Sequence, residues 1–492
     1  MNTGRSFSFA FLLAVALGGS SSQGVNAPKG PVAAYILLEG SYLVDDCPIC
    51  ARPTILQPMG GTFKLVRVDQ NPLFTLYEVR DVSFVAGNLT NWYYKVTGSG
   101  SYQVGGEVAY LQTMTLQAEI NNGYTNKLCY FTNNNQTIDR PWPMIHADLL
   151  QTNGTLAQVY ELNIVAAPVR EIWFSTTAGF TSGNWQSPSN HISPGDLISS
   201  AGRVVKRNTD LTRNLGLMPI APDVGLDAVD IATGGEILFS INQSVFSETL
   251  GPIQHGDLLS NRGRIVRRNQ QLMSAFGLPS TNSDLGLDAV QTLADGSILF
   301  SITTNVFSPK TGTLLSRGDV LSDQGVVFRT HQQLLARFHP SQTNQDFGLD
   351  ALYVWPSGEI WFSTEDGFQD AGLGAVLSGD LLSDQGYRVF GNKELVSDFA
   401  PKETNADFGL DALFVVTDFA APTAPPRLLG ASVQRNNGGL AVQWQGQGRV
   451  FQLERATAVG GPYLPVSQIM PDSTFTDPLA SQPQFFYRLR QW

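Results

Sequence analysis

The sequence predicts an all-β protein organised around an internal repeat, and three observations lead to this prediction. Only 15% of the 492 residues are charged, whereas glycine (48 residues) and proline (27 residues) are frequent, which suits many short strands joined by turns. A phrase of the form Asp-x-Gly-Leu-Asp-Ala occurs four times, and so does an apolar run that ends in Phe-Ser. We expect a β-sandwich-like N-terminal domain, a four-unit β-propeller-like repeat array and a small C-terminal β domain.

The repeat markers keep one spacing through the central part of the chain. The phrases are Asp223–Asp227, Asp284–Asp288, Asp346–Asp350 and Asp407–Asp411, and Gly-Asp pairs begin at Gly195, Gly256, Gly318 and Gly379. Both markers recur at intervals of 61 or 62 residues. The apolar runs begin at Glu171, Glu236, Ser297 and Glu359. Regular spacing of this kind indicates one structural unit per repeat.

Each unit is predicted to contain four antiparallel strands. In the last complete unit, LDALYVW and EIWFST flank the turn PSG, and GDLLSDQGYRVF holds two further strands around DQG. A polar segment follows with Leu395 and Phe399 four residues apart, a spacing that serves one face of either a helical turn or a strand. Repeated four-stranded units are typical of a β-propeller, although common blade families have shorter periods of roughly 40–50 residues.

The array begins and ends within one predicted hairpin. It starts on EIWFS and ends on LDALFVV, so we expect Leu410–Val416 to pair with Glu171–Ser175 and to close a ring. A ring closed in this way leaves no exposed edge strand. The alternative is an open or five-bladed arrangement that uses ELNIVAAP, Glu161–Pro168, as a further strand.

Five segments are expected along the chain. Residues 1–27 have the features of an export signal, with Arg5 ahead of the apolar run Phe7–Gly18 and small residues after it. Residues 28–165 are predicted to be an all-β sandwich or barrel, 166–417 the array, 418–427 a Pro/Ala linker and 428–492 the C-terminal domain. No later segment is apolar enough over the length needed to cross a membrane as a helix. We therefore expect a secreted or cell-surface protein.

The C-terminal domain carries a recognisable set of residues, namely Trp444, the strand Phe451–Glu454, the turn Gly461-Pro462-Tyr463 and the closing run Phe486–Leu489. This pattern resembles the fibronectin type III-like module that ends many secreted bacterial proteins. The resemblance covers residues 428–492, which is shorter than a full module. With the export signal and the array, the whole chain resembles secreted bacterial repeat proteins. This resemblance implies export and display and names no activity.

The cysteines leave several chemistries open. Cys47 and Cys50 lie in DDCPICARP, and Cys129 lies in KLCYF. In an exported protein we expect one disulfide and one leftover thiol. Together with His146 the three thiols could instead form a zinc site. A redox pair at the start of a helix is disfavoured because Pro53 follows closely.

Charge and motifs argue against several classes of function. The net charge of −11 opposes nucleic-acid binding, which needs a basic surface. Asp346-Phe-Gly matches the magnesium-binding D-F-G of protein kinases in letters only, because no Gly-rich loop, strand lysine or His-Arg-Asp loop accompanies it. Gly-x-Ser-x-Gly, His-Glu-x-x-His and P-loop motifs are also absent from the sequence. No catalytic residue is therefore assigned.

The repeated aspartates have two interpretations. An Asp beside Gly in a tight turn accepts hydrogen bonds from backbone N–H groups and fixes the turn. Carboxylates four residues apart could also bind calcium, a hard ion that takes oxygen ligands. Residues repeated four times are expected to be structural, because a substrate breaks symmetry. The calcium candidates are Asp223, Asp227, Asp284, Asp288, Asp346, Asp350, Asp407 and Asp411, and no other cofactor is expected.

Binding candidates are loop residues that break the repeat. They are Trp185 and His191 in one loop, and Glu365, Asp366 and Asp370 in STEDGFQDAG. A Trp on a loop can stack on a sugar ring or fill a pocket of a partner. We expect a non-enzymatic binding or scaffold protein that recognises an extracellular glycan or protein through loops of the array. The alternative is a secreted hydrolase with its active site on a face of the array.

Overall fold

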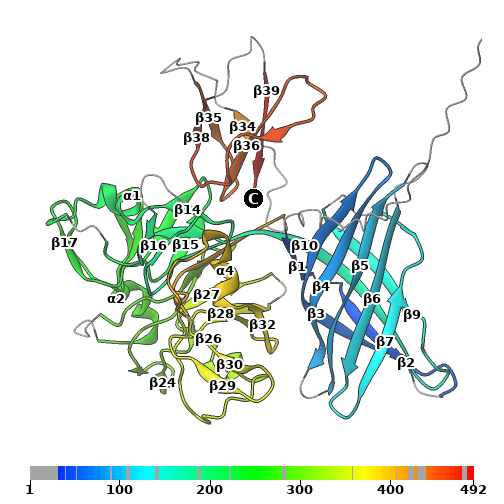
Figure 1. Cartoon of the computed structure of the whole chain (residues 1–492). Coiled ribbons are helices and arrows are strands. Elements are labelled where there is room, and N and C mark those ends of the chain that lie inside the picture. Colours follow the sequence, from blue (N-terminus) through cyan, green and yellow to red (C-terminus); the bar gives the residue numbers. More distant parts are fainter. Residues whose placement is uncertain are drawn as a thin grey trace, which may run out of the picture.

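The computed structural model describes residues 32–492, except for 39, 51–52, 89–90, 107–110, 139–142, 185–189, 221–222, 280–283, 357, 406, 419–425, 429–438 and 479–484. The chain is all-β, with an N-terminal barrel, a ring of four sheets and a C-terminal domain of two small sheets (Figure 1). Within this part of the chain, no helix is long and apolar enough to span a membrane. The predicted export signal and most of the predicted linker lie outside the described residues.

The N-terminal domain is one antiparallel sheet that closes on itself. Its strands are β1 (Val32–Leu37), β2 (Tyr42–Asp46), β3 (Ile55–Gln70), β4 (Phe74–Asn88), β5 (Asn91–Gly105), β6 (Leu111–Asn121), β7 (Asn126–Thr132), β8 (Gln136–Thr137), β9 (Ile145–Gln151) and β10 (Val159–Phe174). They follow the order β1-β3-β4-β5-β6-β7-β9-β10, and β10 pairs again with β1. Of the two alternatives expected for this domain, the barrel is the one that forms, because a single sheet closes instead of two sheets packing face to face.

Inward-facing side chains fill the barrel. Strand β6 alternates buried and exposed residues along its length, as expected when one face of a strand lines a core. Tyr35 stacks on Phe63 with ring centroids 5.2 Å apart, and Phe84 meets Phe63 edge to face. All three rings are almost completely buried in one hydrophobic cluster. The interior of the barrel is therefore a packed core.

Strand β10 joins the barrel to the ring of sheets. Its residues Glu161–Ala166 pair with β9, and its residues Val169–Phe174 pair with the last strand of the array, β33 (Leu413–Thr417). The segment Glu161–Pro168 therefore belongs to the barrel half of one long strand and adds no strand to the ring. The expected boundary after residue 165 falls inside this strand, because its hydrogen bonding continues from one domain into the next.

The array forms four four-stranded antiparallel sheets with the same strand order. Three are β15-β16-β19-β20, β21-β22-β25-β26 and β27-β28-β31-β32, and the fourth is β33-β10-β13-β14. The strand bounds are β13 (Leu197–Ser199), β14 (Arg203–Lys206), β15 (Val229–Ala232), β16 (Glu236–Phe239), β19 (Leu258–Ser260), β20 (Arg264–Arg267), β21 (Val290–Thr292), β22 (Ile298–Phe300), β25 (Val320–Ser322), β26 (Val326–Arg329), β27 (Ala351–Val354), β28 (Ile360–Ser363), β31 (Leu381–Ser383) and β32 (Tyr387–Phe390). The strand content of each unit is as the repeats predict.

The two ends of the array meet and close the ring. Glu171 pairs with Val416 and Phe174 pairs with Leu413, which is the pairing expected from the split hairpin. Strands β15, β21, β27 and β33 are the first strands of the four sheets and contact one another in a cycle. The four sheets are therefore arranged around a common axis lined by these inner strands.

The repeated Phe-Ser runs have a structural role in the ring. The serine that ends each run is buried, and its hydroxyl donates to the carbonyl of the Leu in the next unit's Asp-x-Gly-Leu-Asp phrase. The pairs are Ser175 to Leu226, Ser240 to Leu287, Ser301 to Leu349 and Ser363 to Leu410, at 2.6, 2.7, 3.2 and 2.7 Å. Each sheet is thus hydrogen-bonded to its neighbour in the same way around the whole ring.

Small elements complete each unit. The variable loops contain two-stranded hairpins that the sequence did not suggest, β11 (Phe180–Thr181) with β12 (His191–Ile192), β17 (Val245–Ser247) with β18 (Gly251–Ile253), β23 (Val306–Ser308) with β24 (Thr313–Leu315), and β29 (Phe368–Asp370) with β30 (Gly374–Val376). The polar segments form helical turns, α1 (Asn208–Thr212), α2 (Asn269–Leu272), α3 (His331–Leu334) and α4 (Asn392–Leu395), with 3₁₀ turns η1 (Arg213–Leu215), η2 (Ser274–Phe276) and η3 (Ser397–Phe399). The question left open for these segments is therefore answered by a helix.

The C-terminal domain consists of two three-stranded sheets. They are β34 (Arg427–Leu428), β35 (Leu440–Gln445) and β38 (Thr474–Asp477), and β36 (Phe451–Ala456), β37 (Leu464–Pro465) and β39 (Phe486–Gln491). Trp444 and Phe451 pack together in its small core. The identification of this domain as fibronectin type III-like stays a prediction.

The C-terminal domain covers one end of the ring. The N–H of Gly234, in the turn after β15, donates to the carbonyl of Gly448 at 2.9 Å. Arg449 pairs with Asp230 on β15 and lies over the ring of Phe414 on β33. Because β15 runs from Val229 to this turn, the covered end is opposite to the end that carries the Asp-x-Gly-Leu-Asp phrases.

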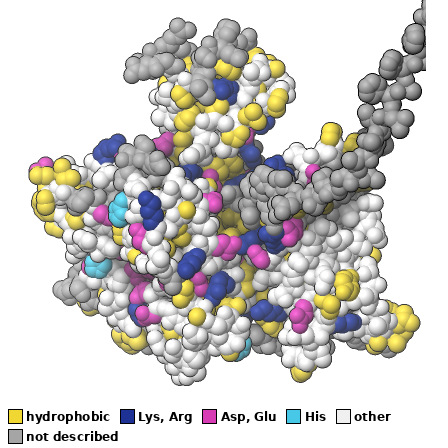
Figure 2. Space-filling view, viewed as in Figure 1, with side chains coloured by type: hydrophobic (Ala, Val, Ile, Leu, Met, Phe, Trp, Pro, Cys, Tyr) yellow, Lys and Arg dark blue, Asp and Glu magenta, His cyan; other side chains and the backbone are white. Residues whose placement is uncertain are grey.

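Polar and charged contacts join the ring to the barrel. Lys64 of β3 pairs with Glu394 of α4, and Arg337 donates to the carbonyl of Gly87 at 3.2 Å. A cavity of about 510 Å³ lies at this junction, between barrel residues such as Met59 and ring residues such as Glu359. Figure 2 shows basic and acidic side chains interspersed where the domains meet, without a large patch of one sign.

Candidate functional site on the axial face of the ring

The candidate site is the end of the ring that the C-terminal domain leaves uncovered. Each Asp-x-Gly-Leu-Asp phrase leads into an inner strand, β15, β21, β27 or β33, with at most one residue between the phrase and the strand. Since the inner strands contact one another in a cycle, the four phrases meet around the axis at this end. We call this end the axial face and define it by the four phrases and the residues that contact them.

The first aspartate of each phrase fixes the local backbone. Asp346 accepts the N–H of Gly348 at 3.0 Å and that of Gly318 at 3.3 Å. The first aspartates of the other phrases likewise accept the N–H of the glycine two residues later, at 2.8 to 3.0 Å, and they are Asp223, Asp284 and Asp407. The turn-fixing interpretation is therefore confirmed for these four side chains.

The glycine of each phrase is required by its position. Gly348 has a φ of +73°, in the left-handed region that glycine adopts without strain. A Cβ on Gly348 would also lie 2.5 Å from the carboxyl carbon of Glu365. A side chain on this residue would therefore disturb both the turn and its neighbour.

The aspartate of each Gly-Asp pair holds the start of a helical turn. Asp380 is buried and accepts the N–H of Asn392 at 3.1 Å and that of Leu377 at 3.1 Å. Asp196, Asp257 and Asp319 make the same two kinds of contact in their units. The sequence showed three repeated aspartates in each unit. Two of them, the first aspartate of the phrase and the aspartate of the Gly-Asp pair, accept hydrogen bonds from backbone N–H groups.

A further repeated position was missed in the sequence because one unit departs from it. Asn392 accepts the N–H of Phe408 at 2.8 Å and donates to the carbonyl of Gly409 at 3.0 Å. Asn208 and Asn269 do the same in their units. His331 takes this place in the remaining unit, where its Nε2 accepts the N–H of Phe347 at 3.2 Å. Burial lowers the pKa of His331, which favours the neutral ring that this contact needs.

The second aspartate of each phrase has a different role from the first. Burial is the main cause that raises the pKa of all four, Asp227, Asp288, Asp350 and Asp411. The pKa of Asp227 rises to about 7. Neighbouring carboxylates raise the pKa of Asp288 and Asp350 further, because like charges disfavour ionisation. These four side chains, which we call the axial aspartates, therefore share one electrostatic environment.

Two rings of positions around the axial aspartates vary from unit to unit. One position follows the second strand of each sheet, lies over the glycine of that sheet's own phrase and is Thr177, Asn242, Thr303 or Glu365. The other precedes the Gly-Asp pair and is Pro194, His255, Arg317 or Ser378. Each position has the same place in every sheet, but its side chain differs between units, apart from the threonine shared by Thr177 and Thr303. The repeat therefore breaks on the axial face, around the axis.

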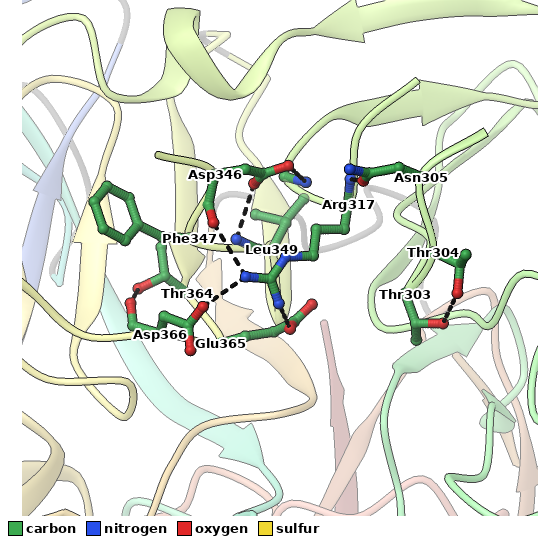
Figure 3. Close-up of polar contacts among 12 residues, drawn as sticks. Thr303, Thr304, Asn305, Arg317, Asp346, Phe347, Leu349, Thr364, Glu365 and Asp366 are labelled. Carbon is green, nitrogen blue, oxygen red and sulfur yellow. Dashed lines mark hydrogen bonds and ion pairs between the residues drawn. The ribbon is translucent and has the colours of Figure 1, made fainter. Parts of the chain in front are cut away.

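Arg317 lies among Asp346, Glu365 and Asp366 on this face, as Figure 3 shows. Its guanidinium pairs with Glu365, contacts Asp366 at 2.5 Å and donates to the carbonyl of Asp346 at 3.1 Å. Burial raises the pKa of Glu365, while the charge of Arg317 opposes that rise. Glu365 also neighbours Asp288, so it connects the arginine to the axial aspartates.

The other variable residues make weaker polar contacts on the same face. The Nε2 atom of His255 lies 3.4 Å from a carboxylate oxygen of Asp284. Ser378 donates its hydroxyl to Asp407 at 2.8 Å, and Thr303 donates to the carbonyl of Leu285 at 2.9 Å. His255 and Ser378 thus contact the phrase of the next sheet, whereas Thr303 contacts the phrase of its own sheet.

The structure separates the loop residues chosen from the sequence. Glu365 and Asp366 lie together on Arg317, on the axial face. Asp370 is buried and accepts the N–H groups of Gly372 and Leu373, so it is a turn residue and not a ligand-binding one. His191 is exposed on β12, and Trp185 lies outside the described residues. Arg317 was missed because the contacts that single it out join distant loops.

The structure also places the cysteines and the candidate metal ligands. Among the described residues, no group of three or more His, Cys, Asp or Glu side chains is arranged to hold a metal ion. Cys47 and Cys50 form a disulfide, and Cys129 is a buried thiol in the barrel core. One disulfide and one leftover thiol are the state expected from the sequence. Calcium binding by the repeated aspartates stays a prediction, although the first aspartates already accept backbone N–H groups.

The axial face offers hydrogen-bonding and charged groups. The acids nearest the axis are the repeated aspartates, with Glu365 as a unit-specific acid beside them. His255 faces Asp284, a turn-fixing aspartate. The arrangement can recognise polar or charged groups through unit-specific side chains.

Comparison with known proteins gives little further information. No protein-family model matches the chain, and no curated protein matches it either. Among solved structures, the extracellular domain of a putative hybrid two-component system from B. thetaiotaomicron aligns over 88% of each chain. That alignment has 8% sequence identity and a TM-score of 0.18.

Proposed function

We propose that this protein is a non-enzymatic, secreted or cell-surface binding protein that recognises a glycan or protein through the axial face of the ring. We also infer that the ring is a four-bladed β-propeller, with each four-stranded sheet as one blade. The observation that carries the proposal is the break in the repeat on one face. Positions that are constant between units hold the backbone, whereas the two variable positions surround the axis.

The contrast between constant positions that hold the backbone and variable positions on one face supports a binding role for the variable positions. A residue needed for the fold is expected in every unit, because each unit has the same backbone to satisfy. Arg317 and Glu365 lie in adjacent units, and the equivalent positions of the other units carry no such charge pair. Unit-specific side chains held on a rigid ring form a pre-organised surface, which lowers the entropy cost of binding.

Export is supported by two features of the chain. The first residues have the pattern of a signal peptide, with a short apolar run after Arg5. The Cys47–Cys50 disulfide suits an oxidising compartment, where such bonds persist. An extracellular location agrees with a glycan or protein as the ligand.

The proposal is tested by screening the chain from residue 28 onward on glycan and peptide arrays. We expect a hit that is lost in an Asn242→Ala/Arg317→Ala variant, because both side chains lie on the axial face. A Glu119→Gln/Glu161→Gln variant, altered on exposed barrel strands, should keep the hit. Loss of the hit in the barrel variant and its retention in the ring variant would contradict the proposal.

A secreted hydrolase is the second candidate function. It is favoured by one observation, the neighbouring carboxyl groups of Glu365 and Asp288, because paired acids serve in general acid and base catalysis. The test is hydrolysis of a panel of aryl glycosides and esters by the wild type and a Glu365→Gln variant. Turnover that disappears in the variant would favour the hydrolase, and no turnover would leave the binding proposal as the better one.

A further inference from the structure

The repeat also breaks at the end of the ring that the C-terminal domain covers. The side chains three residues after the second aspartate of each phrase are buried and chemically different, and they are Asp230, Gln291, Tyr353 and Phe414. Asp230 accepts the N–H of Thr292 at 2.8 Å, and Gln291 donates to the carbonyl of Val354 at 3.0 Å, so both side chains reach the inner strand of the next sheet. Of the four positions, Asp230 alone carries an acid.

Arg449 of the C-terminal domain occupies the seam between the inner strands β33 and β15, which contact each other. Its Nη2 pairs with the carboxylate of Asp230, and its Nε donates to the carbonyl of Ile231. The guanidinium carbon lies 4.9 Å from the centroid of the Phe414 ring. The side chain of Asp230 is only 2% exposed, so the ion pair is shielded from water. The ring therefore offers the cation a carboxylate, a carbonyl and an aromatic face.

This combination of groups suits a guanidinium. Nε and Nη2 donate within one plane, while the flat face of the same group can lie over an aromatic ring. A lysine ammonium is a point charge on a flexible stem and lacks both the planar fork and the stacking face. Burial raises the pKa of Tyr353 to about 12 and the charge of Arg449 opposes that rise, so the cation also acts on the inner strand β27.

The C-terminal domain presents Arg449 from a fixed loop. The N–H of Arg449 donates to the carbonyl of Trp492 at 2.6 Å, and the carbonyl of Gly448 accepts the N–H of Gly234 from the ring at 2.9 Å. Val450 and Trp492 are buried in one hydrophobic cluster with inner residues of the ring. These backbone and apolar contacts do not involve the guanidinium, so we expect the domain to stay docked when the arginine side chain is shortened.

We propose that the seam between β33 and β15 is a guanidinium-binding site that the chain fills with its own Arg449, so that a guanidinium from another molecule is excluded while the C-terminal domain is docked. The C-terminal domain is then an intramolecular ligand, which closes this end of the ring and leaves the axial face to partners. The inference goes beyond the proposed function, because it concerns the opposite end of the ring and holds whatever the axial face binds.

The test is calorimetric titration of an Arg449→Ala variant of the chain from residue 28 onward with ethylguanidinium, which replaces the atoms that the substitution removes. We expect saturable binding to the variant and binding to the wild type that is weaker by about tenfold or more, because Arg449 already occupies the site. Ethylammonium has the same charge without the planar fork and should bind the variant more weakly by a similar factor. Adding Asp230→Asn to Arg449→Ala should weaken ethylguanidinium binding equally, since the carboxylate is removed.

The matched control is Arg488→Ala. Arg488 pairs with Glu454 and lies over the ring of Tyr463, but these contacts are within the C-terminal domain and its side chain is 56% exposed. This variant should bind ethylguanidinium no better than the wild type does. Equal binding by the Arg449→Ala and Arg488→Ala variants would overturn the inference, and so would equal binding of the two probes or no binding by folded Arg449→Ala.

A second measurement applies if Arg449→Ala does not fold. Refolding in the presence of ethylguanidinium should then recover the folded variant, whereas refolding in ethylammonium should not. Recovery that is the same with both probes, or absent with both, would refute the guanidinium site.

Discussion

The axial aspartates show how a residue's environment sets its contribution to stability. Each is an acid in a buried position, and its pKa in the folded chain lies above its usual value. For such a group the folded state prefers the protonated form. The contribution of such a group to the free energy of unfolding is therefore fully present below the pKa that its carboxyl group has in the unfolded chain. This contribution is lost as pH rises through the pKa that the group has in the folded chain.

We predict that Asp227→Asn stabilises the protein at high pH. The folded pKa of Asp227 is about 7, against an ordinary value of 3.8. The substitution should raise the free energy of unfolding at pH 8 by on the order of 2–4 kcal/mol, since one pKa unit corresponds to ~1.4 kcal/mol. The gain should shrink toward zero near pH 4. Urea unfolding at several pH values measures it, and a gain that is equal at pH 4 and pH 8 would argue against a buried carboxylate at this position.

His331 gives the opposite dependence on pH. Its pKa is lowered by burial, so the neutral ring stabilises the fold above the ordinary pKa of about 6.5. That stability is lost as pH falls from there through the folded pKa, because the unfolded chain takes up the proton first. His331→Asn restores the residue found in the other units, and it should remove this loss of stability on acidification. Stability curves of His331→Asn and of a control, His339→Asn on the surface, test this. Identical acid profiles for the wild type and His331→Asn would refute the assignment.

At the scale of elements, the serine-to-carbonyl links make neighbouring sheets depend on one another. Ser363 is fully buried at the end of β28 and donates to the carbonyl of Leu410, just ahead of β33. Because β33 pairs with β10, this one bond connects the last complete unit to the closing sheet. The inner strands are too short to be stable alone, so contacts between sheets decide whether they form.

We predict that Ser363→Ala destabilises the ring by about 1–2 kcal/mol, because a buried carbonyl loses its donor. The matched control is Ser341→Ala, whose hydroxyl is on the surface and bonds a neighbouring glutamine. Chemical denaturation followed by tryptophan fluorescence measures both variants. A loss in Ser341→Ala as large as that in Ser363→Ala would show that the link has no special role.

The sequence allowed the main strands of the array and the pairing of its two ends to be predicted, but not its smaller elements. Strand positions followed from the repeated runs, and the pairing of Leu413–Thr417 with β10 followed from the split hairpin. The hairpins in the variable loops were missed because they differ in sequence between units. The helical turns were left open because Leu395 and Phe399 suit either period.

The candidate site was harder to predict than the fold. Glu365 and Asp366 were selected because they break the repeat, and both lie on the axial face. Arg317 gave no local signal, since its partners are 29 to 49 residues away. Ring closure was predicted from the split hairpin, but the spacing of the repeats did not show that the second aspartate of each phrase is the one buried near its counterparts.

At the scale of the whole molecule, one strand and one small domain set which surface is available for binding. Strand β10 belongs to both the barrel and the ring, so the barrel is fixed against the side of the ring. The C-terminal domain contacts the turn after β15 and covers the opposite end. These attachments leave the axial face as the end of the ring that presents the variable residues.

The measurement that tests this account most directly is a paired one on Arg317→Ala. We would determine its thermal unfolding midpoint and its binding to the ligand found by array, beside the wild type. Arg317 is partly buried, with its side chain 28% exposed, and it is bonded to Glu365, Asp366 and the carbonyl of Asp346. We therefore predict that the variant still folds and that its midpoint falls by a few degrees, as for a loss of about 1 kcal/mol, together with loss of binding. A large fall in the midpoint with binding unchanged would contradict the account, because it would place Arg317 in the scaffold and the ligand elsewhere.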